Sequence, residues 1–129
     1  MIKNYIFAIL VIFSSSIKAE NERFYQEICA KFLNGKMEVV MSDKTRVDIV
    51  TKDQAIEVDW AHKCYEAIGQ SLYYSSKTGL NAGIILIVDD INKDQKYIDR
   101  VKFLIRVKSI KIYLYVIDVK SKELKLIDK

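Results

Sequence analysis

Proline is absent from the 129-residue chain, which also has only four glycines, two cysteines and one histidine. Without proline, the turns must rely on Asn, Asp, Ser and the few glycines. The cysteines do not form a Cys-x-x-Cys pair and His62 is the single histidine, so the usual zinc ligand patterns are not met. Half of the residues are hydrophobic, which favours one packed core and argues against wholesale disorder. A chain of this length accommodates one modest domain.

The N-terminal segment has the pattern of a secretory signal peptide. Lys3 precedes the apolar run 5–13, and a serine-rich stretch then ends at Ala19 before Glu20. We expect cleavage between these two residues, which would leave a domain of residues 20–129 that is exported, either to the periplasm or out of the cell. An uncleaved anchor is the alternative, but the run is too short to span a bilayer, which takes roughly 20 apolar residues, so we expect no stable membrane insertion.

Cleavage would also remove two lysines and no acids, lowering the net charge of +4 by two. The resulting mildly basic balance is only weak evidence for a polyanionic partner.

The apolar pattern predicts an α/β fold built on a mixed sheet. Apolar residues at helical spacing predict three helices, at 22–33, 62–79 and 94–109. Branched and aromatic runs predict five strands, at 37–41, 46–51, 54–60, 82–90 and 110–118, and the tail 121–129 has room for one more. An antiparallel meander followed by helical crossovers predicts helices on both faces of the sheet.

Two of these predictions are more specific. The run at 82–90 is continuously apolar, which is typical of a strand buried on both faces, whereas the alternation at 110–118 predicts an outer strand. Cys29 and Cys64 each fall on the apolar side of a predicted helix. They are either buried free thiols or, because export permits oxidation, a disulfide.

Three acids interrupt two of the predicted strands. Asp48 lies within 46–51, and Glu57 and Asp59 lie two residues apart within 54–60, on one face of their strand. A hairpin would bring Asp48 into the same region, where the carboxylates would repel one another without a positive charge between them. A hard divalent ion, Mg²⁺ or Mn²⁺, fits such a group. The alternative is a set of solvated acids at an edge of the sheet.

Two further polar residues lie on the helix after these strands. Lys63 and Gln70 are seven residues apart, so they share the helix face opposite the apolar stripe. That face begins directly after the acidic strand, where the Lys63 ammonium could hold a phosphate oxygen or orient a water. An ordinary solvated helix face is the alternative.

The order helix, three strands, helix, strand, with an acid on the second strand and another on the third, resembles the PD-(D/E)XK nuclease superfamily of restriction-endonuclease-like folds. The resemblance covers residues 22–118. The stretch TRVDIVTKDQAIEVDWAHKCYEAIGQSLYYSSKTG, residues 45–79, is similar to a group of small bacterial proteins of that superfamily. It implies an αβββαβ core with an additional helix and strand.

The resemblance also implies roles for individual residues. Asp48 and Glu57 correspond to the metal-binding pair, with the Val58 carbonyl as a further ligand. Gln70 matches a polar helix position near the active site. A glutamate of the first helix often assists in the superfamily, and either Glu22 or Glu27 could take that part.

One position departs from the superfamily pattern. Asp59 stands where a lysine is expected, so either Asp59 becomes an extra metal ligand and Lys63 supplies the ammonium, or the chemistry has been lost. The function implied is a metal-dependent nuclease in which Lys63, Asp59 and Gln70 serve catalysis, with DNA favoured over RNA as substrate. Lys31, Lys77 and the basic segment 100–111 could add phosphate contacts, or serve only as solubilising charge.

Two alternatives remain: a catalytically inactive member of the fold that binds nucleic acid or a protein partner, and an exported interaction domain without a nucleic-acid role.

Overall fold

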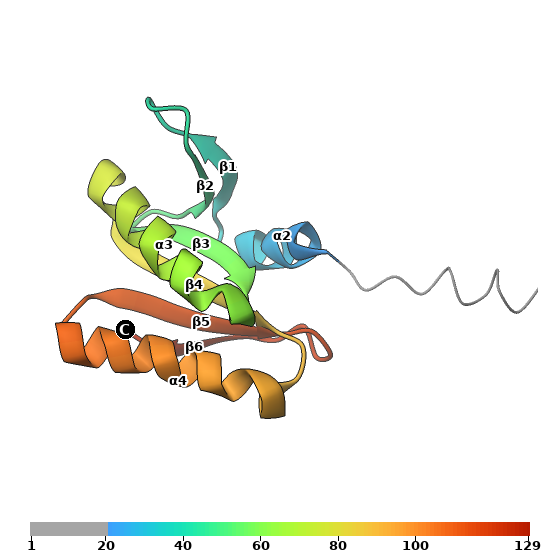
Figure 1. Cartoon of the computed structure of the whole chain (residues 1–129). Coiled ribbons are helices and arrows are strands. Elements are labelled where there is room, and N and C mark those ends of the chain that lie inside the picture. Colours follow the sequence, from blue (N-terminus) through green and yellow to red (C-terminus); the bar gives the residue numbers. More distant parts are fainter. Residues whose placement is uncertain (1–20) are drawn as a thin grey trace, which may run out of the picture.

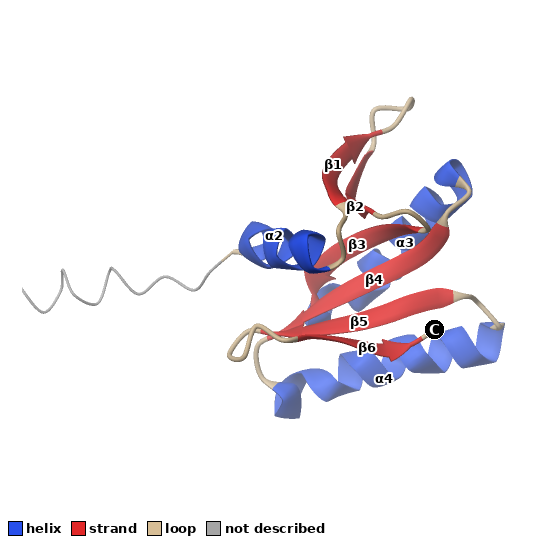
Figure 2. Ribbon diagram, turned by 180° about the vertical axis from the view of Figure 1, so that it is seen from behind, coloured by secondary structure: helices blue, strands red, loops and turns tan. Residues whose placement is uncertain are grey.

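A computed structural model describes residues 21–129 as a six-stranded mixed sheet with three α-helices (Figures 1 and 2). The expected signal peptide lies outside the described residues. Within residues 21–129, no helix is long and apolar enough to cross a membrane. The predicted fold class, α/β with a mixed sheet, is therefore confirmed for this part of the chain.

The elements occur in the predicted order, with a sixth strand added. In chain order they are α2 (Glu22–Phe32), β1 (Lys36–Val40), β2 (Arg46–Val50), β3 (Gln54–Trp60), a 3₁₀ turn (Ala61–Lys63), α3 (Cys64–Thr78), β4 (Asn81–Val88), α4 (Ile91–Lys108), β5 (Ile112–Asp118) and β6 (Leu124–Asp128).

Local side chains fix where the helices begin and end. The Asn21 side chain accepts a hydrogen bond from the Phe24 N–H at 3.1 Å and caps α2. Asp90 caps α4 in the same way, so this helix begins three residues before the predicted start at 94. Gly79 ends α3 with a φ of +73°, a left-handed conformation that glycine adopts without a steric penalty.

The sheet order is β1-β2-β3-β4-β5-β6. The pairs β1/β2 and β2/β3 are antiparallel, β3/β4 and β4/β5 are parallel, and β6 returns antiparallel to β5. The prediction that residues 110–118 form an outer strand is wrong, because β6 pairs along β5 and takes the edge. The prediction for β4 is confirmed, since every residue after Asn81 in this strand is buried.

Helices cover both faces of the sheet. On one face α2 packs on Ile56, Ile85 and Ile117, and on the other α3 and α4 pack on Ile84 and Leu114. Figure 1 shows α3 and α4 together on the near side, with α2 set apart from them.

This layering decides the state of the cysteines. Cys29 is buried beneath α2, and Cys64 is buried on the opposite face of the sheet, beneath α3. Both are free thiols, so the disulfide alternative is excluded. Burial raises the pKa of the Cys29 thiol to about 12, which keeps it protonated.

Close approach of β3 and β4 requires a glycine in the middle of β4. A Cβ at Gly83 would lie 2.8 Å from Ile56 Cγ1 and 2.9 Å from Gln54 Oε1. We expect Gly83→Ala to lower the free energy of unfolding by about 1–3 kcal/mol, as overpacking does in a tight core. Gly69→Ala in α3 is the matched control, because a Cβ there meets nothing within 4 Å. It should stabilise the helix by up to about 1 kcal/mol. Denaturant unfolding measures both, and equal effects of the two substitutions would contradict the steric account.

Candidate functional site

A row of carboxylates crosses the antiparallel part of the sheet. The register of β1 with β2 pairs the neighbours of Glu38 with the neighbours of Asp48. The β2/β3 pairing ends at Ile49 and Ile56, and the next residues, Asp48 and Glu57, interact through their side chains. Three adjacent strands therefore each contribute one acid to the same row, and directly opposed residues lie on the same face of a sheet.

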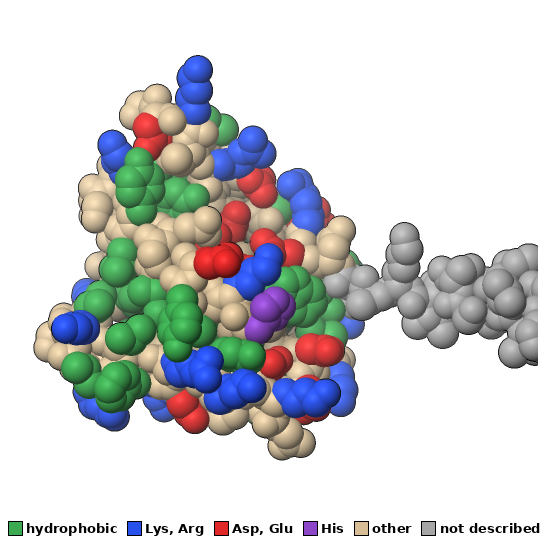
Figure 3. All heavy atoms as spheres, in the orientation of Figure 1, with side chains coloured by type: hydrophobic (Ala, Val, Ile, Leu, Met, Phe, Trp, Pro, Cys, Tyr) green, Lys and Arg blue, Asp and Glu red, His purple; other side chains and the backbone are tan. Residues whose placement is uncertain are grey.

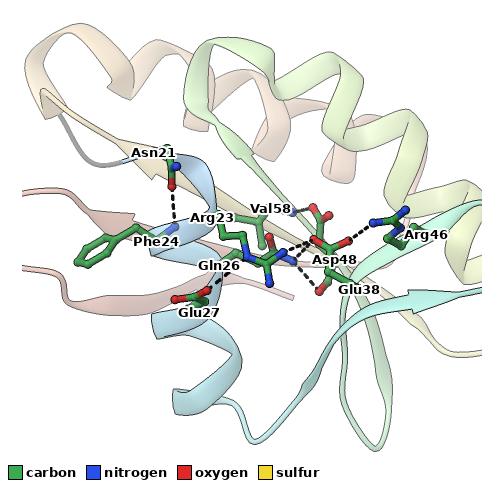
Figure 4. Close-up of polar contacts among 9 residues, drawn as sticks. All are labelled: Asn21, Arg23, Phe24, Gln26, Glu27, Glu38, Arg46, Asp48 and Val58. Atoms are coloured by element: carbon green, nitrogen blue, oxygen red, sulfur yellow. Dashed lines mark hydrogen bonds and ion pairs between the residues drawn. The ribbon is translucent and has the colours of Figure 1, made fainter. Parts of the chain in front are cut away.

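Asp48, the middle acid, accepts two hydrogen bonds, one at its carboxylate and one at its backbone carbonyl (Figure 4). Its Oδ2 accepts the Val58 N–H at 2.8 Å, and its carbonyl oxygen accepts Gln26 Nε2 at 2.9 Å. Gln26 is 4% exposed and reaches this strand from α2. The Asp48 carboxylate is thus fixed in position by the third strand, while its strand is fixed by the first helix.

Glu38, at the outer end of the row, is neutralised by arginines. Arg23 Nη1 and Arg46 Nη1 each lie 3.6 Å from its carboxylate oxygens, and Gln26 Nε2 donates to it at 3.0 Å (Figure 4). Its φ of +55° is a left-handed conformation that residues other than glycine adopt rarely. The sequence analysis did not include this residue in the site.

Glu57, at the inner end, has no cation paired with it among the described residues. It is 7% exposed, and its Oε2 is buried without a hydrogen-bond partner. Burial, followed by the charge of Asp48 and a hydrogen bond with it, raises the pKa of Glu57 far above its usual value. Burial also raises the pKa of Asp48. At neutral pH and without a cation, Glu57 therefore carries a proton and donates it to Asp48.

Asp59 continues the acidic region toward α3. It is 6% exposed, and burial raises its pKa, while the Trp60 N–H at 3.0 Å and the Lys63 ammonium lower it. Glu66 of α3 adds another negative charge nearby. Figure 3 shows acidic side chains gathered near the middle of this face, over the region where β3 ends and α3 begins.

The structure selects Glu22 as the glutamate of the first helix that joins the site. Its carboxyl hydrogen-bonds with Asp59, and burial, followed by the charges of Asp59 and Asp48, raises its pKa to about 7. The Lys63 ammonium acts in the opposite direction. Glu27, the other candidate, instead pairs with Arg23 at 3.3 Å on the exposed side of α2.

Lys63 lies at the site, and Gln70 lies on α3 between two residues that interact electrostatically with the carboxylates. Lys63 is exposed at the end of the 3₁₀ turn and acts electrostatically on both Asp59 and Glu22. Gln70 is exposed on α3, and no hydrogen bond within residues 21–129 joins its side chain to a carboxylate. Glu66, one turn before Gln70 on α3, acts on Asp59, and burial together with the charges of Glu57 and Asp48 raises the pKa of Tyr74, one turn after it. Gln70 therefore shares a helix face with two residues that interact with the carboxylates.

Gln26 is a site residue that the sequence analysis missed. Its burial could have been predicted from the sequence, because it precedes Cys29 by three residues and Ala30 by four and so shares their buried helix face. A glutamine on that face requires a polar partner inside the protein. The partner itself, on a strand more than twenty residues away, could not be read from the helix.

No protein-family model, no curated protein and no solved structure matches the chain.

Proposed function

We propose that this protein is a metal-dependent phosphodiesterase that hydrolyses nucleic acid, built on an αβββαβ core similar to that of the restriction-endonuclease-like superfamily. The observation that carries the proposal is the pair formed by Asp48 and Glu57. Glu57 is buried and Asp48 half-buried, they interact across adjacent strands, and neither has a paired cation among the described residues, whereas Glu38 beside them has two arginines.

The distribution of cations around the site supports a bound divalent ion. Arg23 and Arg46 pair with Glu38 at one end, and Lys63 acts on Asp59 at the other. The central pair therefore retains a strong attraction for positive charge. The unpartnered Oε2 of Glu57 fits the same interpretation, since a buried carboxylate oxygen without a partner is costly.

The donor set suits Mg²⁺ or Mn²⁺. Within residues 21–129 no group of three or more His, Cys, Asp or Glu side chains is arranged to hold a metal ion. Asp48 and Glu57 would hold the ion as two carboxylates, with the remaining positions taken by water and substrate oxygens. This is the manner in which Mg²⁺ is usually bound at phosphate-processing sites. A metal ion so held lowers the pKa of a bound water and polarises the phosphate.

The protein's own residues supply the other parts of the chemistry. The Lys63 ammonium is exposed at the entry to α3, where it can contact a phosphate oxygen and stabilise the charge that develops on it. Asp59, hydrogen-bonded with Glu22, is placed to position a water at the same end of the site. Gln26 and Val58 keep Asp48 in position by their hydrogen bonds.

The second candidate is a catalytically inactive protein of the same fold that binds nucleic acid or a protein partner. The observation that favours it is Asp59, because this buried acid stands where the superfamily usually has its lysine. Metal binding without cleavage would support this candidate. An exported interaction domain would show neither metal binding nor salt-sensitive nucleic-acid binding.

Incubation with labelled DNA and RNA, each single- and double-stranded, tests the proposal. We expect cleavage in Mg²⁺ or Mn²⁺ and none in chelator. Glu57→Gln, purified in parallel, controls for contaminating nucleases. Binding of nucleic acid without cleavage under every metal condition would replace the proposed function with the second candidate.

A further inference from the structure

An exposed aromatic and basic surface lies on α3 and α4, next to the carboxylates but distinct from them. Tyr65 of α3 and Phe103 of α4 are 60% and 53% exposed, although aromatic side chains usually cover apolar surface. They line a depression of about 610 Å³ together with Arg100, Lys102 and Arg106. We refer to these five residues as the α3–α4 patch. Figure 3 shows hydrophobic side chains gathered over these helices, with Lys and Arg side chains along their border.

The charges of the patch favour an anionic ligand. None of its three cations forms an ion pair within residues 21–129. The one acid of the depression, Asp99, accepts a hydrogen bond from Gln95 Nε2 at 2.9 Å. The guanidinium carbon of Arg106 lies 6.0 Å from the centroid of the Phe103 ring, which is within the range of a cation–π contact.

The ligand must therefore offer both negative charge and flat apolar faces. Single-stranded nucleic acid offers both, because its phosphates contact Lys and Arg while its unpaired bases stack on aromatic rings. In a duplex the bases are already stacked on each other inside the helix, so Tyr65 and Phe103 could not reach their faces. The combination of two exposed rings and three cations thus favours a single strand.

The patch is also continuous with the candidate site. Tyr65 directly precedes Glu66, whose charge acts on Asp59, and lies two residues after Lys63. Both regions lie on the face shown in Figure 3. A strand seated on the patch would therefore extend over the start of α3 toward Asp48 and Glu57.

We propose that the α3–α4 patch binds single-stranded nucleic acid by stacking bases on Tyr65 and Phe103 and by contacting phosphates with Arg100, Lys102 and Arg106. The inference names the substrate class of the proposed nuclease. It rests on that proposed function for the cleavage of the bound strand, whereas the binding step itself does not depend on cleavage.

Fluorescence anisotropy in chelator tests the binding step without cleavage. The probes are a labelled oligothymidylate, an oligouridylate of the same length (about 12 nucleotides) and a hairpin duplex. We expect both single strands to bind at least about 10-fold more tightly than the duplex. Phe103→Ala and Tyr65→Ala should each weaken single-strand binding by roughly 5- to 150-fold, as for the loss of one base–aromatic stack. The logarithm of the affinity should fall with the logarithm of the salt concentration with a slope of about −2, about −0.7 for each of three cations.

Phe32→Ala is the matched control, because Phe32 is 72% exposed on α2, on the opposite face of the sheet. Its binding should equal that of the wild type, and thermal unfolding should confirm that all three variants are folded. Duplex binding as tight as single-strand binding, or equal effects of Phe103→Ala and Phe32→Ala, would overturn the inference. Single-strand binding by the patch without cleavage in Mg²⁺ or Mn²⁺ would support the inference and reject the nuclease. Cleavage in metal that does not depend on Phe103 or Tyr65 would reject the inference and support the nuclease.

Discussion

Replacing Glu57 with glutamine is expected to abolish metal binding and metal-dependent cleavage together while leaving the protein folded. The wild-type side chain is already protonated at neutral pH without a metal ion, and it donates to Asp48. A glutamine amide has nearly the same shape and can donate the same hydrogen bond, but it cannot supply a charged oxygen to a metal ion. The substitution therefore removes the proposed ligand without leaving a buried charge unpaired.

The loss of metal binding can be measured as a change in thermal stability. A ligand present at about 100 times its dissociation constant stabilises a folded protein by about 2.7 kcal/mol. For a domain of this length that corresponds to a rise of about 10 °C in the thermal midpoint. We expect such a rise for the wild type in Mg²⁺ or Mn²⁺ and none for Glu57→Gln. Glu123→Gln, which changes an exposed acid outside the site, should behave as the wild type.

The same residue makes the stability of the metal-free protein depend on pH. The pKa of Glu57 is raised in the folded state above its usual value of 4.5, and that of Glu22 is raised to about 7. Groups with a raised pKa stabilise the fold fully below their unfolded-state value, and this stabilisation is lost as the pH rises through the folded-state value. The free energy of unfolding in chelator should therefore fall between about pH 5 and about pH 8.

Asp48 and Asp59 add to this decline, because burial raises the pKa of Asp48 to about 6 and also raises that of Asp59, whereas Asp43 does not contribute in this interval. Hydrogen bonds from Thr45 and Tyr73 lower the pKa of Asp43 to about 2, so its stabilisation is complete above its usual value of 3.8. In Glu57→Gln the decline between about pH 5 and about pH 8 should be smaller, leaving the part due to Glu22, Asp48 and Asp59. A metal ion should stabilise the wild type more at about pH 8 than at about pH 5, because it competes with the proton of Glu57. Metal stabilisation that is unchanged in Glu57→Gln would remove this residue from the site.

Lys63→Ala is expected to lower the cleavage rate by a factor of about 100 or more while the fold and the metal-induced rise in thermal midpoint are kept. In the resemblance to the PD-(D/E)XK superfamily, the buried acid Asp59 stands where an ammonium is expected, and a carboxylate cannot itself stabilise negative charge on a phosphate. The Lys63 ammonium acts on Asp59 and Glu22, which places it at this end of the site. Loss of one preorganised group that stabilises developing charge typically costs this factor.

Lys77→Ala is the control on the same helix, because Lys77 lies in the last turn of α3, near Tyr73 and Asp43. It should change cleavage by only a small factor. Asp59→Lys, combined with Lys63→Ala, tests whether an ammonium at the usual position of the superfamily restores cleavage. A wild-type rate in Lys63→Ala would exclude Lys63 from the chemistry and leave Asp59 and the metal ion to account for it.

Local patterns in the sequence were sufficient for the elements of the fold. The spacing of apolar residues predicted every helix and strand of residues 21–129 to within a few residues, with the tail strand β6 left as an open option. Asn21 caps α2 and Gly79 ends α3, and such helix ends depend on residues that are close in sequence. The continuous apolar run of β4 was enough to place that strand inside the sheet.

Part of the candidate site could also be predicted from the sequence. Alternation along a strand sets Glu57 and Asp59 on one face whatever the rest of the chain does. A short turn between β2 and β3 restricts their register, which is why Asp48 could be expected beside Glu57. The partners contributed by α2 could not be predicted from the sequence, since this helix directs Gln26 and Arg23 to Glu38 but Glu22 to Asp59.

The sequence by itself determined the order of the elements, the faces of the strands and the burial of both cysteines, because each depends on a period of two or 3.6 residues within one segment. Only the tertiary structure decided that the cysteines lie on opposite faces of the sheet and that β5 is internal. It also decided that arginines neutralise Glu38 while Asp48 and Glu57 face each other without a paired cation among the described residues. The reason is that a residue's own segment fixes the direction of its side chain, whereas the docking of distant helices and strands fixes what that side chain meets.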